Sequence, residues 1–119
     1  MLPELIFLVQ ASPTDFGIEA GVPCRIKISK NGEGDPVLAF ASEDLGRQLI
    51  AGRRLNGEVT LLPLSKLSSD QAQESKRRNV LLFEKSEQVA RYLEQGEKFD
   101  FGQLLVSFED ATRMLQNAL

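Results

Sequence analysis

The chain has 119 residues, of which 42% are hydrophobic, and its 14 basic and 17 acidic residues give a net charge of −3. This length suits one domain, residues 1–119, with a core large enough to fold without a metal or a disulfide. The sequence has no histidine and one cysteine, which excludes imidazole catalysis, histidine-ligated zinc, an internal disulfide and multi-cysteine metal clusters. No cofactor is indicated.

The charge is unevenly distributed along the chain. Residues 1–78 hold ten acidic and ten basic residues, whereas residues 79–119 hold seven acidic and four basic ones. Because neither part is basic, nucleic acid is an unlikely partner. The apolar run Leu5–Val9 is far shorter than the roughly 20 residues that span a bilayer, and it lacks the pattern of a signal peptide. We therefore expect a cytoplasmic protein without a membrane partner, with Cys24 as a free thiol.

Three strands are predicted in the first third of the chain. The continuous apolar run Leu5–Val9 predicts a buried strand. Residues 24–29 alternate between apolar and polar side chains, which predicts a strand with one wet face. The Asn31-Gly32 pair favours a tight turn, so we expect an N-terminal hairpin with the next strand, Val37–Phe40. That second strand is apolar on both faces and should be central.

A helix and an edge strand follow. Ser42 and the two acids after it are typical of a helix start, and Gly52 is the expected helix end. Residues 58–64 predict another strand. Because Pro63 cannot donate a ladder hydrogen bond, the end of this strand should lie at a sheet edge or a bulge.

The polar segment 65–79 has few apolar residues and predicts a mobile loop, with a short helix from about Ser69 as the alternative. Beyond it, Val80–Phe83 predicts an apolar strand, and residues 86–96 predict a helix. Residues 103–106 predict the last strand. The chain then ends in an amphipathic helix that a capping box starts and whose apolar stripe is Phe108, Ala111, Leu115 and Leu119.

The two halves of the chain resemble each other. Val37–Phe40 aligns with Val80–Phe83 at an offset of 43, and after one insertion the helices align at an offset of 44. This pattern predicts two β-α-β repeats, residues 37–64 and 80–108. The alternative is that capped helices beside apolar strands match by composition alone. We expect an α+β fold: a mixed sheet of five or six strands with helices mainly on one face, an N-terminal hairpin and a C-terminal helix.

Few residues are candidates for chemistry. Cys24 is the only soft nucleophile, but alternation places Arg25 on the opposite face, so a small buried hydrophobe is the simpler interpretation. The acidic pairs Glu43-Asp44 and Glu109-Asp110 follow helix-capping serines, where the helix dipole already favours acids. Such pairs also suit general acid-base catalysis or a hard cation. No catalytic residue and no metal ligand is assigned.

Two groups of residues are candidates for binding. Two basic clusters would form a polyanion patch if segment 65–79 folds over, and their members are Arg53, Arg54, Lys76, Arg77 and Arg78. Exposed apolar residues would mark a partner surface, for which the candidates are Phe99, Phe101, Phe108 and Leu115. The simpler interpretations are solvated helix ends for the first group and core packing for the second.

Two short stretches resemble known families. The opening Glu4–Val9 resembles the first strand of HicB-type antitoxin domains. Val37–Leu45 with Val59–Leu67 resembles the strand-helix-strand unit of SseB-type domains. Neither resemblance includes a diagnostic motif, so no function is carried over from either.

The sequence therefore favours a non-enzymatic protein-interaction or regulatory domain that binds a protein partner or itself, as a homodimer through a sheet edge or the last helix. The alternative function is a small-ligand or polyanion-binding module that uses the basic clusters. An enzyme that uses carboxylates or Cys24 is the third hypothesis.

Overall fold

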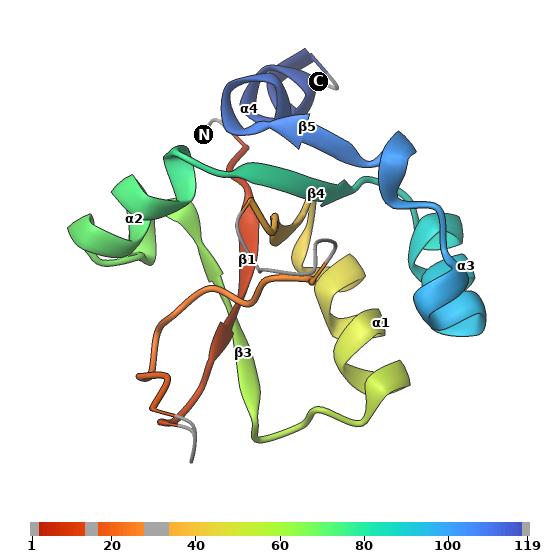
Figure 1. Ribbon diagram of the computed structural model, residues 1–119, viewed down its shortest axis with the longest axis horizontal. Helices are drawn as coiled ribbons and strands as arrows, with labels where there is room; N and C mark the ends of the chain where they lie inside the picture. Colours follow the sequence, from red (N-terminus) through yellow and green to blue (C-terminus); the bar gives the residue numbers. More distant parts are fainter. Residues whose placement is uncertain (1–2, 14–16, 28–33, 118–119) are drawn as a thin grey trace.

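The computed structural model describes residues 3–13, 17–27 and 34–117 (Figure 1). The five strands are β1 (Ile6–Gln10), β2 (Val37–Phe40), β3 (Val59–Pro63), β4 (Asn79–Phe83) and β5 (Leu105–Ser107). The α-helices are α1 (Glu43–Arg53), α2 (Ser69–Lys76), α3 (Ser86–Gln95) and α4 (Phe108–Asn117). Short 3-10 turns lie at Leu64–Lys66, Gly96–Lys98 and Phe101–Gln103. Within these ranges no helix is long and apolar enough to cross a membrane.

The strands form one mixed sheet in the order β3-β1-β2-β4-β5, which confirms the predicted α+β fold. β1 runs antiparallel to both of its neighbours, β2 and β4 are parallel, and β5 is antiparallel to β4. The central position predicted for Val37–Phe40 is confirmed. The edge position predicted from Pro63 is also confirmed, since β3 ends the sheet and Pro63 pairs with Ile6 at its end.

The helices cover both faces of the sheet, rather than mainly one as expected. On one face, α1 and α3 pack Leu45, Leu49 and Val89 against alternate strand residues such as Phe40 and Phe83. On the other face, α4 packs Ala111 and Leu115 against the remaining strand residues, and α2 lies beside α4. The strands alternate between two buried faces, so their side chains are apolar throughout and require cover on each side. Figure 1 shows α1 and α2 on opposite sides of β1 and β3.

β2 and β4 pair side by side in the register that the sequence offset gives. Val37 lies opposite Val80 and Phe40 opposite Phe83, with the two phenylalanine rings stacked at 5.5 Å between centroids. The following helices, α1 and α3, also pack together. Each has in its first turn a glutamate that forms an ion pair with an arginine four residues later, Glu43–Arg47 and Glu87–Arg91.

The third elements of the two units differ. β3 runs in the same direction as β2 but lies two strands away, beyond β1, whereas β5 is the antiparallel neighbour of β4. The second unit is therefore not a parallel β-α-β unit. The similarity between residues 37–64 and 80–108 holds for a strand and a helix, and duplication of the whole unit remains a hypothesis.

The predicted N-terminal hairpin is visible only in part. Segment 22–26 lies between β1 and β2 where the two strands diverge: the Cys24 N–H donates to the Leu8 carbonyl, and the Leu38 N–H donates to the Cys24 carbonyl. Arg25 makes an isolated antiparallel bridge to Val37. The Asn31-Gly32 turn falls in residues 28–33, outside the described residues.

Two local expectations are corrected. Segment 65–79 takes the helical alternative, because the Ser68 hydroxyl accepts the Gln71 N–H and starts α2 at Ser69. Gly52 does not end α1, which continues to Arg53 and is capped by Arg54 in the left-handed conformation (φ 55°). A Cβ atom on Gly52 would lie 2.5 Å from the Leu93 side chain, so this glycine allows α1 and α3 to pack closely.

Candidate functional site

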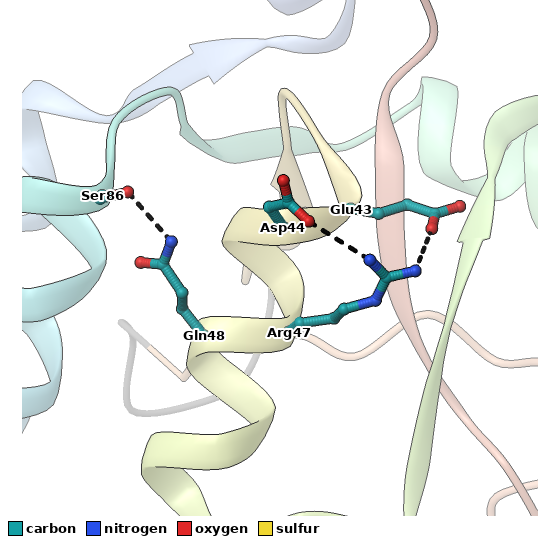
Figure 2. Close-up of polar contacts among 5 residues, drawn as sticks. All are labelled: Glu43, Asp44, Arg47, Gln48 and Ser86. Carbon is teal, nitrogen blue, oxygen red and sulfur yellow. Dashed lines mark hydrogen bonds and ion pairs between the residues drawn. The ribbon is translucent and has the colours of Figure 1, made fainter.

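The first acidic pair lies in the first turn of α1, at the carboxyl ends of the parallel strands β2 and β4. Arg47 binds Glu43 at 2.7 Å and Asp44 at 3.3 Å, and all three side chains are at least half exposed. Beside them, the Gln48 amide donates to the Ser86 hydroxyl at 3.0 Å and links α1 to α3 (Figure 2). Exposed ion pairs of this kind contribute little to stability. Their arrangement is that of a solvated helix start.

The second acidic pair has the same arrangement on α4. Asp110 lies 2.8 Å and Glu109 3.5 Å from the Arg113 guanidinium. The Ser107 hydroxyl accepts the Asp110 N–H at 3.1 Å, which confirms the predicted cap. Within the described ranges no group of three or more acidic or cysteine side chains is placed to hold a metal ion.

Cys24 lies largely buried against the α1–α3 side of the core. Burial raises the pKa of its thiol from 9.0 to about 11, and a weak hydrogen bond from the Gln10 amide at 3.7 Å opposes this only in part. Because the thiolate is the reactive form, this environment keeps Cys24 inert at neutral pH. The side chain acts as a packing residue.

The structure does not bring the five basic residues together. Arg53 and Arg54 end α1 on one face of the sheet, whereas Lys76 and the two arginines after it end α2 on the other. Arg78 is further tied to its own surroundings, since it pairs with Glu74 at 2.9 Å and donates to the Asp35 carbonyl. The condition for a single polyanion patch, that segment 65–79 folds over toward Arg53 and Arg54, is therefore not met, and the two clusters lie at two separate helix ends.

Two of the expected partner residues are part of the core. Leu115 is 6% exposed, and Phe108 stacks parallel to Phe7 with 6.4 Å between ring centroids. The apolar stripe of α4 thus covers the sheet of its own chain and is not a partner surface. In the described chain the one large apolar side chain that is well exposed is Ile18, at 42%.

Phe99 and Phe101 belong to an aromatic cluster at the α3 end of the sheet. The cluster comprises Phe83, Tyr92, Phe99 and Phe101, whose neighbouring ring centroids lie 5.1–6.4 Å apart. The Arg53 guanidinium lies 4.7 Å from the centre of the Tyr92 ring, within the range of a cation-π contact. Both phenylalanines are half-buried by these contacts.

A cavity of about 640 Å³ opens beside this cluster, and we call it the Arg53 cavity. Two cations and two aromatic rings line it, together with one aliphatic residue and one glycine: Lys27, Arg53, Tyr92, Phe101, Ile26 and Gly96. From the sequence, Arg53 and Phe101 are candidates in two different groups, and neither Lys27 nor Tyr92 is a candidate. Their juxtaposition depends on the packing of α1 against α3, which no local motif reveals.

A second opening, of about 250 Å³, lies between α1 and the edge strand β3. This α1–β3 groove is lined by α1 residues, among them Glu43, Arg47 and Ile50, and by Val59–Leu61 of β3. The Leu64 N–H donates to the Leu5 carbonyl, and the Ala11 N–H donates to the Glu58 carbonyl. In this register the backbone N–H and C=O groups of the even-numbered β3 residues therefore point toward β1. The backbone groups of Leu61 and Pro63 consequently face the outer edge. The Val59 N–H points to the same side but already donates to the Leu55 carbonyl at 3.4 Å.

No family model matches the chain, and neither curated proteins nor solved structures show significant similarity to it. The two resemblances noted in the sequence find no support in these comparisons.

Proposed function

We propose that this chain is a cytoplasmic, non-enzymatic protein-interaction domain that self-associates through the edge strand β3. The observation that carries the proposal is that β3 has unpaired backbone groups on the side that faces away from β1. Leu61 directs its N–H and C=O outward, and neither group has a partner in the described parts of the chain. The strand, VTLLP, carries no charged side chain, although natural edge strands are commonly blocked by charges.

Two copies of β3 can pair antiparallel about a two-fold axis at Leu61. In this register each Leu61 exchanges hydrogen bonds with Leu61 of the second copy, and each Val59 lies opposite Pro63. Pro63 has no N–H to donate. The Val59 N–H opposite its carbonyl already donates to Leu55, so the Leu61 pair supplies the new hydrogen bonds. The ladder is therefore short, and we expect a weak dimer with an interface smaller than the roughly 1,600 Å² of a standard stable complex.

The charges beside the edge fit a second copy of the same surface. Glu43 and Arg47 line the α1–β3 groove, and Figure 2 shows both side chains on the side of α1 that faces β3. Under two-fold symmetry, a surface that carries both an acid and a base meets its own complement. The side chains of β3 itself are uncharged on both faces, so two copies do not repel each other there.

The other route to a dimer has less support. The last helix uses its apolar stripe on its own sheet, since Ala111 is fully buried and Leu115 nearly so. A dimer through α4 would have to displace this packing. The sheet edge needs no such rearrangement, so it is the route that we propose.

The test is sedimentation velocity of the full chain from about 10 µM to 1 mM, a range that brackets weak dimers. We expect a rising weight-average mass, and we expect Thr60→Lys to weaken dimerisation at least about tenfold because it places a charge at the edge. Thr60 is exposed and its own backbone groups face β1, so the variant keeps the fold. Gln103→Lys makes the same charge change near the opposite edge and should have no effect.

Amide hydrogen exchange adds a site-specific measurement. The Leu61 N–H should become protected as concentration rises, whereas the Leu62 N–H, which faces Phe7 of β1, should be protected at every concentration. A chain that stays monomeric at 1 mM would overturn the proposal. A dimer that Thr60→Lys leaves intact would assign the contact to another surface.

A further inference from the structure

The Arg53 cavity combines two kinds of recognition group, cations and aromatic rings. Its two charged lining residues, Lys27 and Arg53, are both cations, and its two rings are Tyr92 and Phe101. No acidic side chain is among its described lining residues. A cavity of about 640 Å³ falls in the usual range of small-molecule sites, about 300–1,000 Å³.

Arg53 differs from the arginines of the exposed helix faces. Arg47, Arg91 and Arg113 each bind a carboxylate one helical turn earlier. Arg53 has no such partner among the described residues, and its guanidinium lies against the Tyr92 ring instead. Because the Arg53 guanidinium has no hydrogen bond or ion pair in the described parts of the chain, its N–H donors are available to an anion.

The surroundings hold the site in place. Tyr92 is fixed between Arg53 and Phe101, with 5.6 Å between the two ring centroids. Gly96 ends α3 with a φ of 58°, and a Cβ atom at this position would meet nothing within 4 Å. The glycine therefore contributes open space as well as the turn.

We propose that the Arg53 cavity binds a small planar aromatic molecule that carries a negative group. The ring of the ligand stacks against Phe101, and its anionic group accepts hydrogen bonds from Arg53 and Lys27. Nucleotides and aromatic carboxylates share this chemistry. The inference is independent of self-association, because the cavity lies beside α3 and not at the β3 edge.

The test is a titration of the 15N-labelled full chain followed by NMR, with one nucleotide and one aromatic carboxylate as probes. Adenosine 5′-monophosphate and 2-naphthoate each combine a ring with an anion. Two half-probes serve as controls: adenosine carries only the ring, and inorganic phosphate carries only the anion. We expect at least one combined probe to shift the amides of Arg53, Tyr92 and Phe101 with a Kd of about 1 mM or below. The two half-probes should bind at least about tenfold more weakly, since each forms one kind of contact. The combined probe that binds identifies the source.

The matched variants are Arg53→Gln and Arg54→Gln. They remove the same charge from adjacent residues, but only Arg53 lines the cavity. Arg53→Gln and, as a second variant, Lys27→Gln should weaken probe binding about tenfold, whereas Arg54→Gln should change it less than about twofold. The proposal is overturned if neither combined probe shifts these amides at 10 mM, if a half-probe binds equally well, or if Arg54→Gln matches Arg53→Gln.

Discussion

Gly52→Ala tests the close contact between α1 and α3. By helix propensity alone the substitution should stabilise α1, since glycine costs about 0.5–1 kcal/mol relative to alanine in a helix interior. The structure predicts the opposite sign. A Cβ atom at Gly52 would lie 2.5 and 2.7 Å from the two Cδ atoms of Leu93 and 3.1 Å from its Cγ atom.

The magnitude follows from these distances. Ordinary van der Waals contact begins near 3.4 Å, so Leu93 must change rotamer or the helices must separate by most of an ångström. Overpacking of this kind costs about 1–3 kcal/mol. After the propensity gain, we expect a net loss of up to about 2.5 kcal/mol in the free energy of unfolding.

Urea denaturation of a double-mutant cycle with Leu93→Ala separates the two contributions. In the Leu93→Ala background the clash is gone, so Gly52→Ala should become neutral or stabilising. Ala51→Gly, on the exposed neighbouring residue, measures the propensity contribution in the same helical turn. The reasoning is refuted if Gly52→Ala alone stabilises the chain as much as Ala51→Gly destabilises it, because Leu93 would then offer no resistance.

Two further predictions concern Cys24 and the helix caps. With a thiol pKa near 11 instead of 9.0, alkylation of Cys24 by iodoacetamide at pH 8 should be at least about 100-fold slower in the folded chain than in urea. Since the unfolded thiol ionises first, the free energy of unfolding should fall between about pH 9 and 11, and Cys24→Ala should remove that part of the slope; a slope that Cys24→Ala leaves unchanged would contradict this assignment. Ser107→Ala should cost about 1 kcal/mol by urea denaturation because it loses the bond to the Asp110 N–H. Ser42→Ala should cost less, since the Ser42 side chain makes no cap bond; equal losses would argue against the assigned caps.

The sequence was sufficient for features that depend on local chemistry and on alternation. The buried strand Leu5–Val9, the central strand Val37–Phe40 and the edge position of Pro63 were all predicted, because each follows from side-chain polarity or a missing N–H. The offset of 43 between the two apolar strands coincides with the register of β2 against β4, although no pairing between them was predicted. Such features are encoded within a few residues of each other.

What the sequence could not give depends on long-range packing. Segment 65–79 is polar and looks like a loop, yet a single serine cap and a position beside α4 make residues 69–76 helical. From the sequence, Gly52 suits a helix end as well as a close contact between two helices. Only the position of Leu93 in the fold shows that the close contact is the reason for the glycine. The Arg53 cavity assembles Lys27, Arg53 and Phe101 from three distant segments, so no spacing rule could have joined them.

The strand order has a consequence for the way the chain is made. β1 lies inside the sheet, but one of its neighbours, β3, ends at Pro63 and is synthesised much later. At about 5–20 residues per second, a nascent chain carries this apolar strand with an open edge for several seconds. The parallel neighbours β2 and β4 pair only once Phe83 has been synthesised, and α4 covers one face of the sheet only once residues 108–117 follow. Phe7 of β1 gains its stacking partner Phe108 only then, so β1 stays open on this face while the 100 residues between them, 8–107, are made.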